Sequence, residues 1–170
     1  MDKFRVVVTD ANILINLIHI GQLPLLGALV GFDFVVPDEV VAEILDPEQA
    51  GALQEALQAG FVAFVSIADT EELAIFTALT TSLGKGESAC LALAERRGWM
   101  IASDEGGAFR REANQRLGTG RLINTLPPTS HSHVVFVDSG PSARHGYPEQ
   151  LATICCGQSF RLENRIAGAT

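Results

Sequence analysis

The sequence has little of what marks disulfide-stapled, membrane-spanning or nucleic-acid-coating proteins. It holds three cysteines, two of them adjacent (Cys155 and Cys156), which provides neither a disulfide framework nor the paired spacing of a zinc site. Its apolar runs are too short to span a bilayer, and the opening "MDKFRVVV" lacks the pattern of a cleavable signal peptide. We therefore expect a cytoplasmic protein with no membrane association.

Basic residues are few and unevenly placed. The formal net charge of −8 disfavours broad electrostatic binding to nucleic acid, although it leaves room for a local basic patch. The two lysines are Lys3 and Lys85. The candidate basic patch consists of arginines from one stretch of sequence: Arg96, Arg97, Arg110, Arg111, Arg116 and Arg121.

The chain otherwise reads as one globular α/β domain. At 170 residues and 47% hydrophobic, it can bury a sizeable core. Short β-branched or aromatic runs alternate with segments of helical apolar spacing. Strands are predicted at 4–8, 32–36, 61–67, 99–103 and 121–125, and helices at 11–21, after Pro24, at 38–45, 48–59, 69–81, 86–97 and 105–117. Strands separated by helices pair in parallel, which predicts a three-layer α/β/α sandwich with a central parallel sheet.

The segment after residue 125 has a different character. Residues 126–170 hold three of the four histidines and four of the seven prolines. We therefore divide the chain into a domain of residues 1–125 and a C-terminal extension, which we expect to pack on that domain. "HVVFVDSG" predicts a sixth strand, and "LATICCGQSFRLENRI" is compatible with a helix or a hairpin. His131 and His133 alternate as on a strand, and a polar strand edge explains them better than a metal site.

Two aspartates stand at equivalent places after predicted strands. Asp10 lies two residues after "VVV" and Asp104 two residues after "IA", each just before a predicted helix. In open parallel sheets, ligands bind beyond the carboxyl ends of the strands. Taken alone, each aspartate is better explained as a helix N-cap, because its side chain accepts hydrogen bonds from exposed N–H groups. Asn12 and Ser103 are likewise explained as polar turn residues.

Glu87 is harder to explain as a surface residue. On the predicted helix it shares a face with Leu91 and Ala94. A carboxylate on an apolar face is costly unless a cation meets it, and the helix dipole offsets only about 1 kcal/mol. A solvated first-turn glutamate remains the alternative, but the pattern favours a cleft that contains a metal ion. Gly84 and Gly86 would let the backbone approach closely there.

A further acid is needed from the exit of the second strand, and periodicity does not choose it. Asp38, Glu39 and Glu43 all fall off the apolar stripe of their helix, so each is compatible with a solvated face. Several carboxylates that converge cannot all stay ionised without cations between them. Their hard oxygens suit one or two Mg²⁺ or Mn²⁺ ions, which would activate a water for in-line attack on phosphorus.

Four blocks of the sequence follow one another in order: "VVVTDANILINL", "VVPDEVVAEIL", "GKGESACLALA" and "IASDEGGAFRREA". They resemble the acidic blocks of the PIN domain, a family of small metal-dependent ribonucleases that includes many VapC-type toxins. The match covers residues 4 to about 125. Each block alone is a weak signal, but four in sequence on the expected alternation of strands and helices are a strong one. The tail departs from the family, whose members usually continue with helical sequence.

The resemblance implies a site, a fold and partners. It assigns catalysis and metal binding to Asp10, Glu43, Glu87 and Asp104, and it selects Glu43 where periodicity does not. Supporting roles fall to Asn12, Ser103 and Glu105. It also implies a sheet of order 3-2-1-4-5, Mg²⁺ or Mn²⁺ as cofactor, an RNA substrate, a small antitoxin protein as partner, and a homodimer.

The residues that follow Asp104 offer a candidate RNA contact. Arg110 and Arg111 could grip flanking phosphates, although a solvated arginine-rich helix face explains them equally well. Trp99 could stack on a base, but its place at the start of a strand favours core packing.

Three hypotheses for function follow. The first is a metal-dependent endoribonuclease, as the toxin of a toxin–antitoxin pair. The second is a catalytically silent PIN-like module that binds RNA or protein. The third is an aspartyl-phosphate α/β domain, which needs a helper lysine beyond a later strand, a role open to Lys85. The presence of all four acids favours the first.

Overall fold

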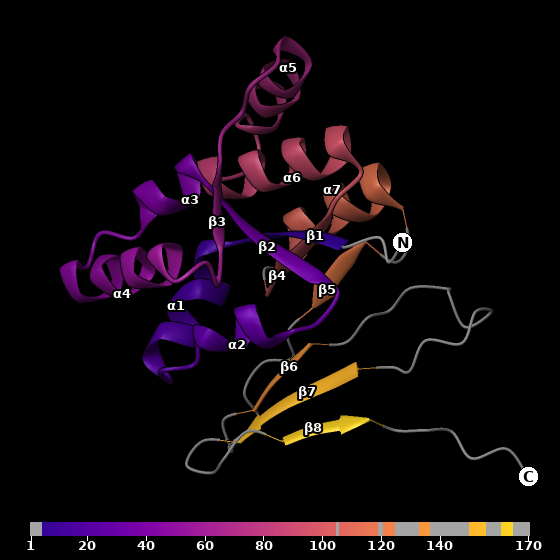
Figure 1. Ribbon diagram of the computed structural model, residues 1–170. Helices are drawn as coiled ribbons and strands as arrows, with labels where there is room; N and C mark the ends of the chain where they lie inside the picture. The colour runs from indigo at the N-terminus through magenta and orange to yellow at the C-terminus, as the bar shows by residue number, and fades with distance from the viewer. Residues whose placement is uncertain are drawn as a thin grey trace, which may run out of the picture.

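Figure 1 shows a computed structural model of the chain, which describes residues 5–104, 106–118, 121–124, 133–136, 150–155 and 161–164. Its centre is a parallel sheet of five strands in the order β3-β2-β1-β4-β5. The strands are β1 (Arg5–Thr9), β2 (Phe32–Pro37), β3 (Ala63–Val65), β4 (Met100–Ser103) and β5 (Leu122–Asn124). The predicted α/β class is confirmed, and the order is the one that the family resemblance implies.

The run "RVVVT" forms the central strand. β1 pairs with β2 on one side and with β4 on the other, and Val7 and Val8 are completely buried. A β-branched run without polar alternation suits this place, because a central parallel strand is covered on both faces.

Seven helices connect the strands among the described residues. They are α1 (Ala11–His19), α2 (Pro24–Ala28), α3 (Asp38–Glu43), α4 (Pro47–Gln58), α5 (Thr70–Leu79), α6 (Lys85–Arg97) and α7 (Gly107–Leu117). Figure 1 shows α1, α2 and α4 on one side of the sheet and α6 and α7 on the other, as right-handed crossovers in opposite directions require. α6 contacts β1, β2 and β4, and its residues 88–94 are buried. The three predicted layers are therefore present, with α6 as the most deeply buried helix.

Most boundaries agree with the sequence-based prediction, and β3 is the main difference. Residues 61–67 are predicted as a strand, but only Ala63–Val65 forms one. Its neighbour along the ladder is β2, where Pro37 lies opposite Val65. Proline has no N–H to extend the ladder, and β3 is an edge strand with Phe64 exposed, so the pairing stops early.

The C-terminal segment contains a second, antiparallel sheet. Its order is β6-β7-β8, formed by β6 (His133–Phe136), β7 (Gln150–Cys155) and β8 (Arg161–Asn164). β6 confirms a strand within "HVVFVDSG", and the pairing of β7 with β8 favours the hairpin alternative for the stretch that follows. His131 lies outside the described residues. The packing of 126–170 on the domain stays a prediction.

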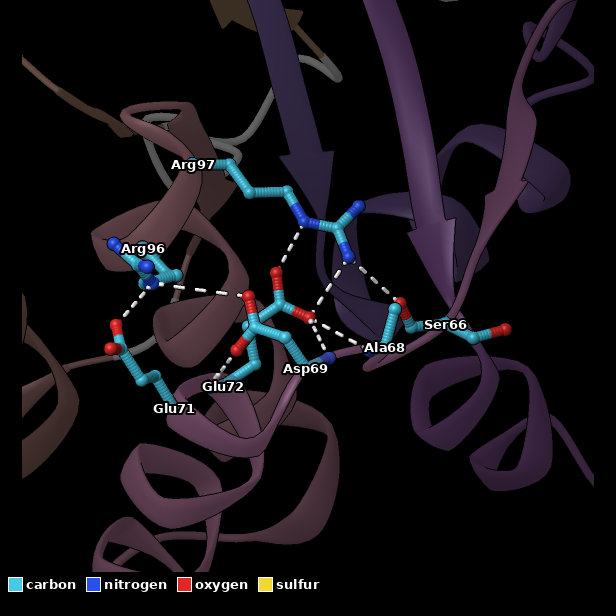
Figure 2. A network of polar contacts seen from close by, with 7 residues as sticks. All are labelled: Ser66, Ala68, Asp69, Glu71, Glu72, Arg96 and Arg97. Carbon is cyan, nitrogen blue, oxygen red and sulfur yellow. Dashed lines mark hydrogen bonds and ion pairs between the residues drawn. The ribbon is translucent and has the colours of Figure 1, made fainter.

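An ion pair with one fully buried partner links α5 to the end of α6. Glu72 is 2% exposed, and Figure 2 shows it held by Arg97 and by the backbone N–H groups of Ala68 and Asp69. The Arg97 Nη2 donates to Glu72 Oε2 at 2.9 Å and to the Ser66 carbonyl at 3.0 Å. The hydrogen bond from Arg97 is the largest of the effects that lower the pKa of Glu72 to about 2. This carboxylate is therefore ionised at neutral pH.

None of the helices in the described ranges is long and apolar enough to cross a membrane.

Candidate active site

The carboxyl ends of β1 and β4 bring Asp10 and Ser103 into contact. Asp10 directly follows β1, and its backbone N–H extends the ladder to the Ala102 carbonyl at 3.2 Å. Its Oδ1 accepts from the Ala11 N–H at 2.6 Å and its Oδ2 accepts from Ser103 Oγ at 3.2 Å. Both side chains are buried, at 4% and 1% exposure. Asp10 is thus the N-cap of α1, and it also shares a buried polar contact with the strand that leads to Asp104.

Asp104 contacts the helix that Asp10 begins. Its Oδ2 accepts a hydrogen bond from Asn16 Nδ2 at 3.2 Å, although the two residues lie 88 positions apart in sequence. The other oxygen, Oδ1, is buried and has no hydrogen-bond partner among the described residues. Asp104 does not cap α7, whose N-cap is Gly106, so the capping explanation is wrong for this residue.

Glu43 and Glu87 each accept a hydrogen bond from the backbone at the start of α6. Glu43, the last residue of α3, accepts from the Gly86 N–H at 2.8 Å. A β-carbon at position 86 would lie 2.6 Å from Glu43 Oε2, so the contact requires glycine there. Glu87 reaches back to the Gly84 N–H at 2.9 Å and is only partly buried. The predicted close backbone approach is confirmed for Gly86.

The thiol of Cys90 lies beneath these acids. Burial raises its pKa well above the usual value, and the charges of Asp10, Glu43, Glu39 and Glu87, in that order, raise it further. Its Sγ is 3.7 Å from the carbonyl oxygen at the end of β1. The charges of carboxylates from three separate crossovers therefore act on one thiol of α6.

Two residues near the acids were not predicted as site residues, namely Asn16 and Glu39. Asn16 lies one helical turn after Asn12 on α1, and that spacing was the available signal for it. Glu39 was one of three candidates that periodicity left equal, and its charge raises the pKa of the Cys90 thiol as that of Glu43 does. Its Oε2 is also buried without a partner in the described part of the chain.

A family model described as DUF3368, a PIN domain, matches residues 6–119. The chain belongs to the PIN-domain family. The match begins in β1 and ends just beyond α7, so it includes all four acids that the resemblance assigned.

Other known proteins resemble this PIN domain less clearly. Among solved structures, VapBC2 from Rickettsia felis bound to a DNA fragment from their promoter is 13% identical, with a TM-score of 0.47, over 62% of this chain and 92% of that one. FitAcB from Neisseria gonorrhoeae is 16% identical, with a TM-score of 0.42, over 62% and 92% respectively. No curated protein matches the sequence.

Each of the four acids of the PIN domain accepts a hydrogen bond from a different donor. The donors are the N–H groups of Ala11, Gly86 and Gly84 and the Asn16 amide. Within the described ranges, no three His, Cys, Asp or Glu side chains are close enough to hold a metal ion together. Carboxylates repel one another when no cation lies between them, so separate donors are the arrangement expected without metal.

The donor set nevertheless fits a hard cation. It consists of carboxylate oxygens, which Mg²⁺ and Mn²⁺ prefer, and Asp104 Oδ1 is a buried acceptor with no described partner. Glu43, Glu87 and Asp104 form no ion pair with a described residue, so no Lys or Arg of that part neutralises them. Mg²⁺ also keeps several of its waters, so it does not need three protein ligands in direct contact.

The candidate basic patch is largely neutralised. Arg96, Arg97 and Arg116 pair with acids on α5, α6 and α7, and Arg121 donates to the Leu117 carbonyl. Arg110 and Arg111, in contrast, are exposed on α7 and form no ion pair within the described residues.

Three other predicted residues have mixed outcomes. Asn12 lies exposed in the first turn of α1, whereas Glu105 falls outside the described residues. Trp99 packs against the core, with the Arg97 guanidinium 4.8 Å from its ring centroid, as core packing predicts.

Proposed function

We propose that this PIN domain is a metal-dependent endoribonuclease. It hydrolyses RNA phosphodiester bonds through Asp10, Glu43, Glu87 and Asp104, with one or two Mg²⁺ or Mn²⁺ ions as cofactor. The observation that carries the proposal is the buried Asp104 Oδ1, which has no hydrogen-bond partner among the described residues and follows directly on the Asp10–Ser103 pair. A buried acceptor without a partner is costly, and a bound cation would remove that cost.

Each residue has a distinct task in this proposal. Asp10 and Asp104 would hold the ion at the ends of β1 and β4, and Glu43 and Glu87 would complete the ligand set from the side of α6. When bound, the ion would supply an activated water and would stabilise the leaving oxygen. Ser103 keeps the Asp10 carboxylate oriented through its hydroxyl. Arg110 and Arg111 would bind phosphates on either side of the scissile bond.

A nuclease assay tests the proposal. The purified protein is incubated with single-stranded and structured RNA in Mg²⁺, in Mn²⁺ and in EDTA, and its Mn²⁺ affinity is measured by calorimetry. We expect cleavage that requires metal and a Kd for Mn²⁺ that calorimetry resolves. Cleavage that persists at full rate in EDTA, or no Mn²⁺ binding, would contradict the proposal.

The second candidate is a catalytically silent module that binds RNA or protein. One observation favours it, namely that no three acids of the described residues share a space of metal-ion size. It predicts that RNA binds without being cleaved and that Mn²⁺ changes neither the melting temperature nor the RNA affinity.

Replacing Gly86 with alanine should separate metal binding from stability. The new β-carbon would overlap the Glu43 carboxylate, which lies at the end of an exposed side chain and can move away. Alanine also stabilises a helix relative to glycine by up to about 1 kcal/mol. We therefore expect a metal-free melting temperature at or above that of wild type, with Mn²⁺ affinity about tenfold weaker or worse.

Gly51→Ala is the matched control for Gly86→Ala. Gly51 lies on α4, where an added β-carbon would meet nothing within 4 Å. This variant should gain similar helix stability and keep wild-type Mn²⁺ affinity. Equal Mn²⁺ affinities in the two alanine variants would remove Glu43 from the proposed ligand set.

The proposal also includes partners. We propose a small antitoxin protein that silences the nuclease, and assembly of the chain as a homodimer. Light scattering of the purified protein measures its molecular mass and so tests for the dimer. To test the silencing, the protein is co-expressed with the product of a short neighbouring reading frame. The RNA assay then measures whether nuclease activity is lost.

A further inference from the structure

Helix α1 connects the two aspartates of the proposed metal site. Asp10 is its N-cap, and Asn16, six residues later, donates to Asp104. The helical rise of about 1.5 Å per residue places these two points about 9 Å apart along a rigid element. The orientation of Asp104 is thus set from the same helix that Asp10 begins.

The hydrogen bond from Asn16 distinguishes the two oxygens of Asp104. Oδ2 accepts from the amide at 3.2 Å, whereas Oδ1 is buried without a described partner. Without that bond, the carboxylate could turn its free oxygen toward water, since Asp104 lies in the connection after β4 and is only partly buried. The amide therefore keeps one acceptor turned away from solvent.

The chemistry of the donor matters as much as its position. A lysine or arginine at this place would neutralise Asp104 and compete with a cation for it. The asparagine amide is neutral, so it can orient the carboxylate while leaving its full negative charge for a metal ion.

We infer that Asn16 is a positioning residue of the proposed metal site, which fixes the Asp104 carboxylate so that Oδ1 is presented to the cation. The inference rests on the proposed function. In this role Asn16 does not touch the ion, and it affects metal binding only through Asp104.

Asn16→Leu tests this role, because leucine is close to asparagine in size and has no donor. Asn16 is exposed, so the metal-free melting temperature should stay at the wild-type value. The Mn²⁺ Kd, measured by calorimetry, should rise by about 10- to 100-fold, as is typical when the partner of a metal ligand is removed. Asn16→Ala should weaken binding to a similar extent. Asn114→Leu, at an exposed asparagine of α7, is the matched control and should keep wild-type affinity.

The outcomes separate this inference from the proposed function. If Asp104→Asn loses Mn²⁺ binding while Asn16→Leu binds as tightly as wild type, the positioning role is wrong and the metal site stands. If wild type itself binds no Mn²⁺, the proposed function fails and the inference fails with it. A weakened affinity that accompanies a lowered metal-free melting temperature in both Asn16 variants would show a role in stability and overturn positioning.

Discussion

Asp10→Asn and Asp104→Asn should each abolish ribonuclease activity and remove most of the stabilisation by Mn²⁺, while the metal-free protein melts at or above the wild-type temperature. Asparagine keeps the shape of aspartate and still caps a helix, so the bond from the Ala11 N–H to residue 10 survives. Each change removes one negative charge from a group of mutually repelling carboxylates, which relieves the metal-free fold. At a Mn²⁺ concentration 100 times Kd, wild type should gain about 2.7 kcal/mol.

Asp46→Asn provides the matched control for these variants. Asp46 caps α4 by accepting from the Glu48 and Gln49 N–H groups, and it is exposed. Its replacement should leave activity and the Mn²⁺ response unchanged. If Asp10→Asn behaves in the same way, with wild-type metal binding and activity, then capping is the whole role of Asp10 and the proposed site is wrong.

The largest loss of stability is expected from Arg97→Met. This change leaves the Glu72 carboxylate, which is 2% exposed, without its cationic partner. Removing one member of a buried ion pair costs about 3–5 kcal/mol, and Arg97 also loses its contacts with Ser66 and the Trp99 ring. For a protein of this size we expect the melting temperature to fall by on the order of 10 °C.

The neighbouring arginine is a direct comparison. Arg96 pairs with Glu71 at 2.7 Å, but both side chains are exposed, at 46% and 66%. Exposed ion pairs contribute between 0 and about 1 kcal/mol, so Arg96→Met should change the melting temperature by only a few degrees. Equal losses in the two variants would show that the burial of Glu72 does not determine the strength of its ion pair.

The deficit of Arg97→Met should also depend on pH. The pKa of Glu72 is about 2 in the folded protein, against an ordinary value of 4.5. A lowered folded-state pKa stabilises the protein fully above pH 4.5, and this contribution is lost as the pH falls toward 2. The difference in stability between wild type and Arg97→Met, measured by urea denaturation, should therefore be largest above pH 4.5 and shrink below it. A difference that stays constant down to pH 3 would assign the loss to packing.

The fold could be predicted from the sequence because its signals are local. A β-branched run such as "RVVVT", the proline that begins α4 and the glycine that ends α6 each act within a few residues. The edge strand β3 was predicted too long, because its length depends on Pro37, which lies opposite it on another strand. Residues 61–67 themselves therefore carry no signal of where the strand ends.

The site could be predicted only in part, for the same reason. Strand ends singled out Asp10 and Asp104, for which capping was the better explanation of each alone, and the choice of Glu43 over its neighbours depended on family resemblance. The proposed role of Asn16 depends on a hydrogen bond to a residue 88 positions away, and that of Gly86 on one 43 positions away. Likewise, the arginine stretch indicated a basic patch because its acidic partners on α5 are distant in sequence.

The central place of β1 has a consequence for synthesis of the protein. β1 is synthesised before the other strands of its sheet, yet it lies in the middle. It can pair only after β2 and β4, its two neighbours, have been synthesised. A translation product that ends before residue 104 contains at most three of the four acids and lacks the end of β4 that brings Ser103 to Asp10. Pairings of such wide sequence separation form late in folding. If the chain hydrolyses RNA as proposed, a nascent or prematurely terminated chain should therefore leave RNA intact until the strand after α6 has paired with the first.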